Sequence, residues 1–299
     1  MYDIIVVGAG PAGLTAAIYG ARAGKSVLVL EAKSYGGQII NTPKIENYPA
    51  MPHVSGFDFA TDLYNQVLAL GVTIKFEKVL DAFDHGEYKL VKGENNEYKT
   101  KTLILATGAD NRKLGIDKEE ELTGHGVSYC ASCDGSFFKN KIVAVTGGGN
   151  VAIEDANYLS NICSKVYLIH RRDTFRADDA DVAELKKKDN VEFILNSNVT
   201  KLNGDNVLES IEVTNKITNE VKTIPLSGLF IAVGQVPENE NFRDLVNIDD
   251  RGYIIANESC ETNVPGIFVA GDARTKTLRQ LVTAEADGAI AATSASRIK

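Results

Sequence analysis

The feature that most constrains the fold is a repeated pattern of strand, glycine-rich turn, helix and strand. The first copy reads "DIIVVGAGPAGLTAAIYGARAGKSVLVLE", and the second, "KIVAVTGGGNVAIEDANYLSNICSKVYLIHRR", follows in register 139 residues later. In each copy an apolar run leads into the glycines and an alanine-containing helical segment follows, which is typical of a dinucleotide-binding βαβ unit. The sequence therefore predicts an α/β protein with two Rossmann-like dinucleotide-binding domains, each built in three layers.

The first copy carries all the parts of a nucleotide-binding turn. Gly8 allows a tight turn out of the strand, Gly10 lets a pyrophosphate approach the backbone, and Gly13 lets the helix pack closely on the sheet. The phosphates are then expected at the free N–H groups of the helix N-terminus. Glu31 ends the next strand, where a carboxylate can accept hydrogen bonds from an adenosine ribose.

The second copy keeps the glycines but changes the acid. Gly147, Gly149 and Ala152 stand at the three glycine positions, and alanine is tolerated at the third of them. His170 stands where the first copy has Glu31. The two sites are therefore expected to take different nucleotides.

A basic segment follows His170 directly. Arg171, Arg172 and Arg176 lie in "HRRDTFRAD". A carboxylate at this strand tip would repel a 2′-phosphate, whereas guanidinium groups can hold one with charge-assisted hydrogen bonds. The alternative is a solvated basic patch at the start of the next helix. Because the basic segment lies at the strand tip of a dinucleotide fold, we favour the first interpretation, in which it binds NADPH rather than NADH.

A late segment favours FAD as the other nucleotide. "GIFVAGDARTKTLRQLVTAEADGAIAA" reads as a buried strand, then Gly271 and Asp272, then an alanine-rich helix. An aspartate at such a strand end can hold a ribityl hydroxyl, and the helix N-terminus can face the flavin or its phosphates. Asp272 acting only as a turn or cap residue is the alternative.

These motifs define the domain organisation. We expect an FAD-binding domain split between residues 1–112 and 241–299, with an NADPH-binding domain at 113–240 inserted between its halves. The two crossings, near "GADNRK" and "GQVPENENF", are polar and could act as hinges. Alternating segments around 74–102 and 207–226 predict antiparallel strands added to each core.

Composition excludes several classes of partner. The chain has 299 residues and a net charge of −8, and no run of Lys and Arg interleaved with aromatics marks a nucleic-acid surface. No apolar stretch approaches the roughly 18 residues of a membrane span, and the chain enters a strand at once, without room for a signal segment. We therefore expect no nucleic-acid or membrane partner and a cytoplasmic location.

The four cysteines are of two kinds. Cys163 and Cys260 have no Cys or His neighbour at metal-ligand spacing, and we interpret them as buried structural residues. Cys130 and Cys133 form a CxxC pair in "SYCASCDGSF", a spacing that lets two thiols cycle between dithiol and disulfide. A zinc site would need a second CxxC or a His pair. His125 is interpreted as an exposed loop residue.

The order of motifs resembles that of the low-molecular-weight thioredoxin reductases. It runs GxGPAG, "GGQI", "ENYP", "ATG", CxxCDG, "GGGNVA", "HRRDTFR" and "GDARTKTLRQ", over essentially the whole chain. The resemblance implies FAD and NADPH as cofactors. The implied FAD contacts are Gly8, Gly10, Pro11, Ala12, Glu31, Gly37, Gln38, Asn47, Gly108, Asp272, Arg279 and Gln280. The implied NADPH contacts are Gly149, Asn150, His170, Arg171, Arg172 and Arg176.

The resemblance also implies roles around the CxxC pair. Cys133 would face the flavin, Cys130 would attack the partner's disulfide, and Asp134 would be the general acid and base. Two departures from the family pattern are local: Ala131 and Ser132 stand between the cysteines where Ala-Thr is common, and alanine replaces the glycine that usually follows "NYP". The first could adjust thiol reactivity.

The resemblance further implies a homodimer, a thioredoxin-like disulfide protein as partner, and a rotation of one domain against the other between half-reactions. The alternatives are an enzyme of the same shape that takes electrons from ferredoxin and a nonenzymatic nucleotide-binding redox sensor. The intact "GGGNVA" and "HRRDTFR" disfavour the first alternative, and a redox pair beside a proton donor disfavours the second.

Overall fold

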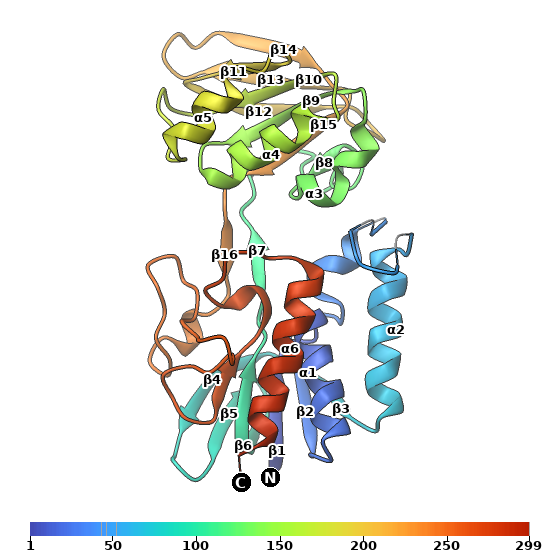
Figure 1. Cartoon of the computed structure of the whole chain (residues 1–299), viewed down its shortest axis with the longest axis vertical. Helices are drawn as coiled ribbons and strands as arrows, with labels where there is room; N and C mark the ends of the chain where they lie inside the picture. Colours follow the sequence, from blue (N-terminus) through green and yellow to red (C-terminus); the bar gives the residue numbers. More distant parts are fainter. Residues whose placement is uncertain (43, 46, 52, 299) are drawn as a thin grey trace. The chain divides into compact units, whose positions relative to one another are not determined.

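The computed structural model describes residues 1–42, 44–45, 47–51 and 53–298. The chain divides into two units, one formed by Met1–Asp110 with Val236–Lys299 and the other by Asn111–Gln235 (Figure 1). The first unit thus consists of two chain segments and the second of one continuous segment.

The first unit contains a seven-stranded sheet in the order β3-β2-β1-β6-β5-β4, with β17 pairing with β6. Strands β1, β2, β3, β6 and β17 run parallel, while β4, β5 and β6 form an antiparallel meander. The prediction of antiparallel strands around residues 74–102 is therefore correct for β4–β6, whereas β3 extends the parallel part. The strands are β1 (Tyr2–Val7), β2 (Val27–Glu31), β3 (Thr73–Phe76), β4 (Val79–Asp84), β5 (Lys89–Gly93), β6 (Glu97–Leu105) and β17 (Ile267–Val269).

Helices cover one face of this sheet. Alternate strand residues such as Ile4, Val6 and Val29 pack against the helices, while Ile5 and Leu28 face the meander side. Figure 1 shows α1 and α6 side by side against the sheet. The helices are α1 (Pro11–Arg22), α2 (Gly56–Ala69) and α6 (Leu281–Ser296), with short 3₁₀ helices η1 (Gly37–Asn41), η3 (Glu240–Phe242) and η4 (Gly271–Ala273).

The second unit also combines parallel and antiparallel strands, but in two separate sheets. Its parallel sheet has the order β11-β10-β9-β15-β8, and a separate antiparallel sheet has the order β12-β13-β14. The predicted strands around 207–226 are present as β13 and β14. The strands are β8 (Val127–Ser128), β9 (Ile142–Gly147), β10 (Lys165–Ile169), β11 (Val191–Ile194), β12 (Ser197–Asn203), β13 (Ser210–Asn215), β14 (Val221–Pro225) and β15 (Gly228–Ala232).

Successive side chains of these strands point to opposite faces of the parallel sheet, and each face is covered by another layer. Val143, Val145 and Phe230 pack against the helical layer, and their neighbours Ala144 and Leu229 pack against the β12–β14 sheet. The helices are α3 (Ala131–Asp134), α4 (Asn150–Ser160) and α5 (Asp179–Leu185), with 3₁₀ helix η2 (Gly135–Phe138). Two three-layer Rossmann-like units confirm the predicted fold class.

The segments that cross between the units pair with each other. Strands β7 (Ala109–Asn111) and β16 (Gln235–Pro237) form a two-stranded sheet, and the Gln235 amide donates to the Asn111 side-chain oxygen at 3.2 Å.

No described helix has the length and hydropathy needed to cross a membrane.

Candidate active site

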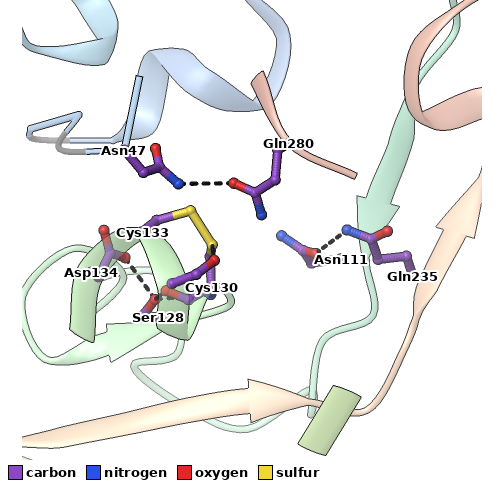
Figure 2. Close-up of a disulfide and its surroundings, with 9 residues drawn as sticks. Asn47, Asn111, Ser128, Cys130, Cys133, Asp134, Gln235 and Gln280 are labelled. Carbon is purple, nitrogen blue, oxygen red and sulfur yellow. Dashed lines mark hydrogen bonds between the residues drawn. A yellow bond between two sulfur atoms is a disulfide. The ribbon is translucent and has the colours of Figure 1, made fainter. Parts of the chain in front are cut away.

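The CxxC pair lies at the start of the short helix α3. Cys130 is the N-cap residue, Cys133 lies inside the single turn, and the two form a disulfide with their Cα atoms 5.3 Å apart (Figure 2). This separation is within the usual range for a disulfide. Both cysteines are half-buried. A bond between residues three apart constrains little of the chain, and partial exposure of the two residues suits thiol–disulfide exchange with a partner.

Ser128 connects Asp134 to the cysteine turn. Its hydroxyl donates to the Asp134 carboxylate at 2.6 Å and accepts from the Cys130 backbone N–H at 3.1 Å (Figure 2). Asp134 in turn donates its backbone N–H to the Cys130 carbonyl at 3.1 Å. The carboxyl is thus held directly after Cys133 in the same turn, the position from which a side chain can exchange a proton with a thiol.

A buried carboxylate anchors the other side of the cysteine turn. Glu119 is 2% exposed and accepts the Tyr129 hydroxyl at 2.7 Å together with the backbone N–H groups of Leu114 and Gly115. Burial, reinforced by this acceptor, raises the pKa of Tyr129, so its phenol stays protonated at neutral pH. Tyr129 directly precedes Cys130, so this hydrogen bond fixes the backbone that leads into the CxxC turn.

The glycine turn of the second unit has the geometry that its sequence predicts. A Cβ on Gly147 would lie 2.3 Å from the Ala232 carbonyl oxygen and 2.7 Å from Ala152 Cβ, so the helix packs closely there. Gly149 is the N-cap of α4, without a side-chain cap, and Asn150 begins the helix with an exposed side chain. The N-terminal N–H groups of α4 are therefore available to an anion.

The basic segment lies at the end of β10. Arg171, Arg172 and Arg176 are exposed, and among the described residues none has an ion pair or side-chain hydrogen bond. The Arg176 N–H donates to the Gly148 carbonyl at 2.8 Å, so this segment is tied to the glycine turn. The three guanidinium groups are free to bind an anion such as a 2′-phosphate.

His170 lies beneath the glycine turn. Its ring is buried, stacks on Phe175 with centroids 5.0 Å apart, and donates to the Thr174 carbonyl over 3.0 Å from Nε2. A Cβ on Gly148 would lie 2.0 Å from the His170 ring. Burial lowers the pKa of His170, which keeps the imidazole neutral at pH 7. This placement indicates that His170 supports the turn from below.

The first unit has the equivalent glycine turn between β1 and α1. Gly8 has a φ of 106°, and a Cβ on Gly13 would meet the Gly8 carbonyl oxygen at 1.9 Å. Gly10 is the N-cap of α1, with Pro11 as the first helical residue and Ala12 buried after it. The turn is thus open toward the helix N-terminus, as a pyrophosphate site requires.

Glu31 is already oriented by the backbone. Its carboxylate accepts the Ala9 N–H at 2.7 Å and the Lys33 N–H at 2.8 Å. Each oxygen keeps a further lone pair, so the same carboxylate can still accept ribose hydroxyls. Gly37, with φ 58°, approaches Gly10 so closely that its added Cβ would lie 3.2 Å from the Gly10 Cα.

Other sequence-predicted residues of this unit lie outside its strands. Gln38 donates to Asp110 at 2.5 Å, and Asn47 donates to the Gln280 side chain at 2.9 Å (Figure 2). Gly108 takes a positive φ of 72° between β6 and β7.

The turn η4 and the segment that follows it contain two buried polar atoms without a partner in the described part of the protein. Asp272 Oδ1 and Arg279 Nε are buried, and neither atom has a hydrogen-bond partner among the described residues. Burial raises the pKa of Asp272. Buried polar atoms are normally paired, so these two indicate a bound molecule with hydroxyl or anionic groups at this turn. The ribityl and phosphate groups of FAD have that chemistry, and the open α1 N-terminus with Glu31 suits its adenosine part.

The remaining cysteines and His125 agree with their sequence interpretation. Cys163 and Cys260 are free and buried, and burial raises their thiol pKa values to about 11 and about 12. His125 is exposed. Among the described residues no group of three or more His, Cys, Asp or Glu side chains could hold a metal ion.

Two Rossmann-like units, one with a CxxC disulfide before its glycine turn, define a nucleotide-dependent disulfide oxidoreductase. The family model for pyridine nucleotide-disulphide oxidoreductases matches residues 2–288. Thioredoxin reductases from Listeria innocua and Bacillus subtilis are each 41% identical, over 99% and 98% of this chain and 93% of each relative.

Solved structures agree with these relatives. The thioredoxin reductase of Streptococcus pyogenes is 41% identical and matches with a TM-score of 0.94 over 99% of this chain and 97% of its own. That of Lactococcus lactis, solved in the FR conformation, is also 41% identical and matches at 0.69 over 100% and 99%. The chain belongs to the pyridine nucleotide-disulphide oxidoreductase family and, within it, to the thioredoxin reductases. Membership implies FAD and NADPH as cofactors.

Sequence reasoning missed several residues of these sites. Ser128 and Glu119 hold the cysteine turn, and Asn239, which is 1% exposed, donates to the carbonyls of Ala273 and Gly252 at 2.9 Å and accepts from the Thr107 hydroxyl at 2.7 Å. Asp287 accepts the Gly271 N–H from within α6. Their partners are brought to them by tertiary packing, and Glu119 and Asn239 stand in polar runs of the sequence, so no local pattern identifies them.

Proposed function

We propose that this enzyme is an NADPH-dependent thioredoxin-disulfide reductase whose Cys130–Cys133 disulfide passes electrons to oxidised thioredoxin. The observation that carries the proposal is the disulfide itself, formed in a half-exposed turn with Asp134 hydrogen-bonded beside it. The overall reaction consumes NADPH, a proton and the thioredoxin disulfide, and yields NADP⁺ and the thioredoxin dithiol. When bound, NADPH supplies a hydride and FAD relays the electron pair to the disulfide.

The proposed cofactor sites follow the geometry of each unit. FAD is held by the α1 turn, Glu31 and the loop from Asp272 to Gln280. NADPH is held by the α4 turn and the basic segment, whose free guanidinium groups favour the 2′-phosphate over the unsubstituted ribose of NADH.

The cysteines have separate roles in the proposal. Cys133 receives the electron pair inside the helical turn, and Cys130, at its N-cap, attacks the thioredoxin disulfide through a mixed disulfide. Asp134 moves the accompanying proton, because its carboxyl is held in the same turn by Ser128.

A change in the arrangement of the two units between half-reactions completes the proposal. Both chain crossings run through the short β7–β16 ribbon, which suits a hinge. The relatives from S. pyogenes and L. lactis are equally identical to this chain yet match it at 0.94 and 0.69, so those two structures differ from one another in shape. The resemblance to the family supports a cytoplasmic homodimer.

Turnover with a cysteine variant tests the function. FAD-loaded enzyme should oxidise NADPH in step with thiol formation in thioredoxin, and Cys133→Ser should abolish this turnover while flavin reduction by NADPH persists. Cys163→Ser, at a buried cysteine, serves as the control and should retain turnover. Continued disulfide turnover by Cys133→Ser would remove the pair from the mechanism. NADPH consumption without thioredoxin reduction in the unaltered enzyme would refute the proposed substrate.

A further inference from the structure

A buried amide joins the two chain crossings inside the first unit. Asn239 is 1% exposed and lies two residues after β16, while Thr107 lies two residues before β7. The Thr107 hydroxyl donates to the Asn239 side-chain oxygen at 2.7 Å. Strands β7 and β16, which Figure 1 shows side by side, carry the chain out of this unit and back into it. One hydrogen bond thus connects the two crossings at the end of their ribbon.

The same amide holds the turn η4. Asn239 Nδ2 donates to the carbonyls of Ala273 and Gly252, each at 2.9 Å. The Ala273 carbonyl also accepts the Ile254 N–H at 3.0 Å, so two donors fix it. Ala273 directly follows Asp272, whose Oδ1 is buried and has no hydrogen-bond partner within the described ranges. The residue proposed to hold the ribityl chain of FAD is therefore next to a carbonyl that Asn239 fixes.

Thr107 also lies against the other turn of the proposed FAD site. A Cβ on Gly8, in the turn before α1, would lie 2.3 Å from the Ala106 carbonyl oxygen and 3.4 Å from the Thr107 nitrogen. The α1 turn therefore packs on the backbone at which the first crossing begins. Both turns of the proposed site thus meet the hydrogen-bond network of Asn239, one at the Thr107 backbone and the other at the Ala273 carbonyl.

The chemistry of an amide suits this position. Its nitrogen donates to two carbonyls and its oxygen accepts from a hydroxyl, so each polar group has a partner of the right kind. A carboxylate of the same shape would face the carbonyls without a donor, and an apolar side chain would offer no partner to any of the three groups. Buried polar groups are normally kept paired, so Thr107, Asn239 and Ala273 are held in a fixed relation.

We propose that Asn239 is a positioning residue that couples the turn η4 to both chain crossings, so that FAD bound at this turn orders the β7–β16 ribbon. Binding that orders the turn restricts the Ala273 carbonyl and, through the amide, restricts Asn239 and Thr107. The pivots of the proposed rearrangement are then firm only in the FAD-loaded enzyme. This inference rests on the proposed placement of FAD and on the proposed rearrangement of the two units.

Hydrogen–deuterium exchange of the full chain, with and without saturating FAD, tests the coupling. In the unaltered enzyme FAD should slow exchange in peptides that cover the turn Gly271–Ala273. It should also slow exchange in peptides that cover the β7–β16 ribbon, by about tenfold, which is the effect of one hydrogen bond of ordinary strength. Peptides from the β13–β14 hairpin of the second unit are the internal reference and should not change.

Two variants interrupt the network on either side of the amide. Asn239→Asp removes both donors and keeps an acceptor for Thr107, so FAD should still slow exchange in the turn but no longer in the ribbon. Thr107→Val keeps both donors and removes the bond to the first crossing, so the slowing in β7 should be reduced. Asn190→Ala is the matched control, because the Asn190 amide also donates to two backbone carbonyls but lies in the second unit.

The outcomes separate the inference from the function on which it rests. Slowing in the ribbon that Asn239→Asp removes and Asn190→Ala retains supports the coupling. Slowing confined to the turn in the unaltered enzyme, or slowing in the ribbon that survives Asn239→Asp, overturns the coupling and leaves the proposed function intact. Exchange in the turn that does not respond to FAD contradicts the placement of FAD and the inference with it. If Asn239→Asp does not fold, Thr107→Val decides: reduced slowing in β7 supports the coupling, and full slowing overturns it.

Discussion

At the scale of single residues, the two units differ at the end of the second strand of the nucleotide-binding motif, which is the proposed basis of their different nucleotide preferences. Glu31 ends β2 with a carboxylate oriented by two backbone N–H groups, whereas His170 follows β10 with its ring turned beneath the glycine turn. The anion-binding capacity of the second unit therefore comes from the exposed arginines after His170. The first unit thus offers a hydrogen-bond acceptor at this position, and the second unit offers cationic side chains close to it.

The arginines are expected to discriminate between NADPH and NADH. In the double variant Arg171→Ala and Arg176→Ala, the KM for NADPH should rise by about two orders of magnitude, since each hydrogen bond to a charged group contributes about 1.5–3 kcal/mol. The KM for NADH should change little. Steady-state kinetics with both nucleotides measures this, with Arg251→Ala, an exposed arginine of the first unit, as control. Equal losses with both nucleotides would refute the 2′-phosphate role.

The buried thiols give a second prediction at this scale. Because burial raises the pKa values of Cys163 and Cys260 to about 11 and about 12, neither forms thiolate at pH 8. A thiol reagent should find no reactive thiol in the oxidised folded enzyme. It should find two after reduction by NADPH, from Cys130 and Cys133, and two in the oxidised unfolded chain. A reactive thiol in the oxidised folded enzyme would contradict these assignments.

At the scale of elements, the βαβ units could be predicted from the sequence because their signals are local. The glycines, the apolar runs and the acid or basic strand tips lie within about 30 residues of one another, which is the length of the motif. The polar anchors could not be predicted, because their partners are set by tertiary packing. Glu119 bonds to Tyr129 across a loop, and Asp287, within α6, bonds to Arg274, which follows η4. The hydrophobic periodicity of the sequence does not predict such pairs of residues.

The β5–β6 hairpin depends on one such anchor. The Tyr98 hydroxyl bonds Glu77 at 2.5 Å, and the N–H groups of Asn95 and Asn96 donate to the same carboxylate. These bonds, that of Tyr98 foremost, lower the pKa of Glu77 to about 2. A lowered pKa means that the stabilisation is fully present above the ordinary value of 4.5 and is lost as the pH falls toward 2.

Thermal unfolding followed by circular dichroism tests this anchor. Glu77→Gln should lower the melting temperature at pH 7, and the difference from the unaltered enzyme should shrink toward zero near pH 2. Glu97→Gln, at an exposed glutamate of the same hairpin, is the control and should have no effect at either pH. A difference for Glu77→Gln that is the same at both pH values would show that the ionised carboxylate is not what stabilises the hairpin.

For the whole molecule, the two units separate the tasks of the reaction. One unit carries the proposed flavin site, while the other carries both the proposed NADPH site and the CxxC disulfide. The sequence repeat predicts both units, and the assignment of FAD to one and NADPH to the other stays a prediction. The proposed alternation between two arrangements about the β7–β16 ribbon would let the nicotinamide and the disulfide each reach the flavin.

The most direct test of the electron path is the colour of the flavin under anaerobic conditions. NADPH, NADH or reduced ferredoxin is added to separate samples of the FAD-loaded enzyme, and oxidised thioredoxin is then added to each. The account predicts rapid bleaching with NADPH, slower bleaching with NADH, and return of the yellow colour on adding thioredoxin. Bleaching by reduced ferredoxin alone would contradict it, because the basic segment and the α4 turn would then play no part in electron transfer.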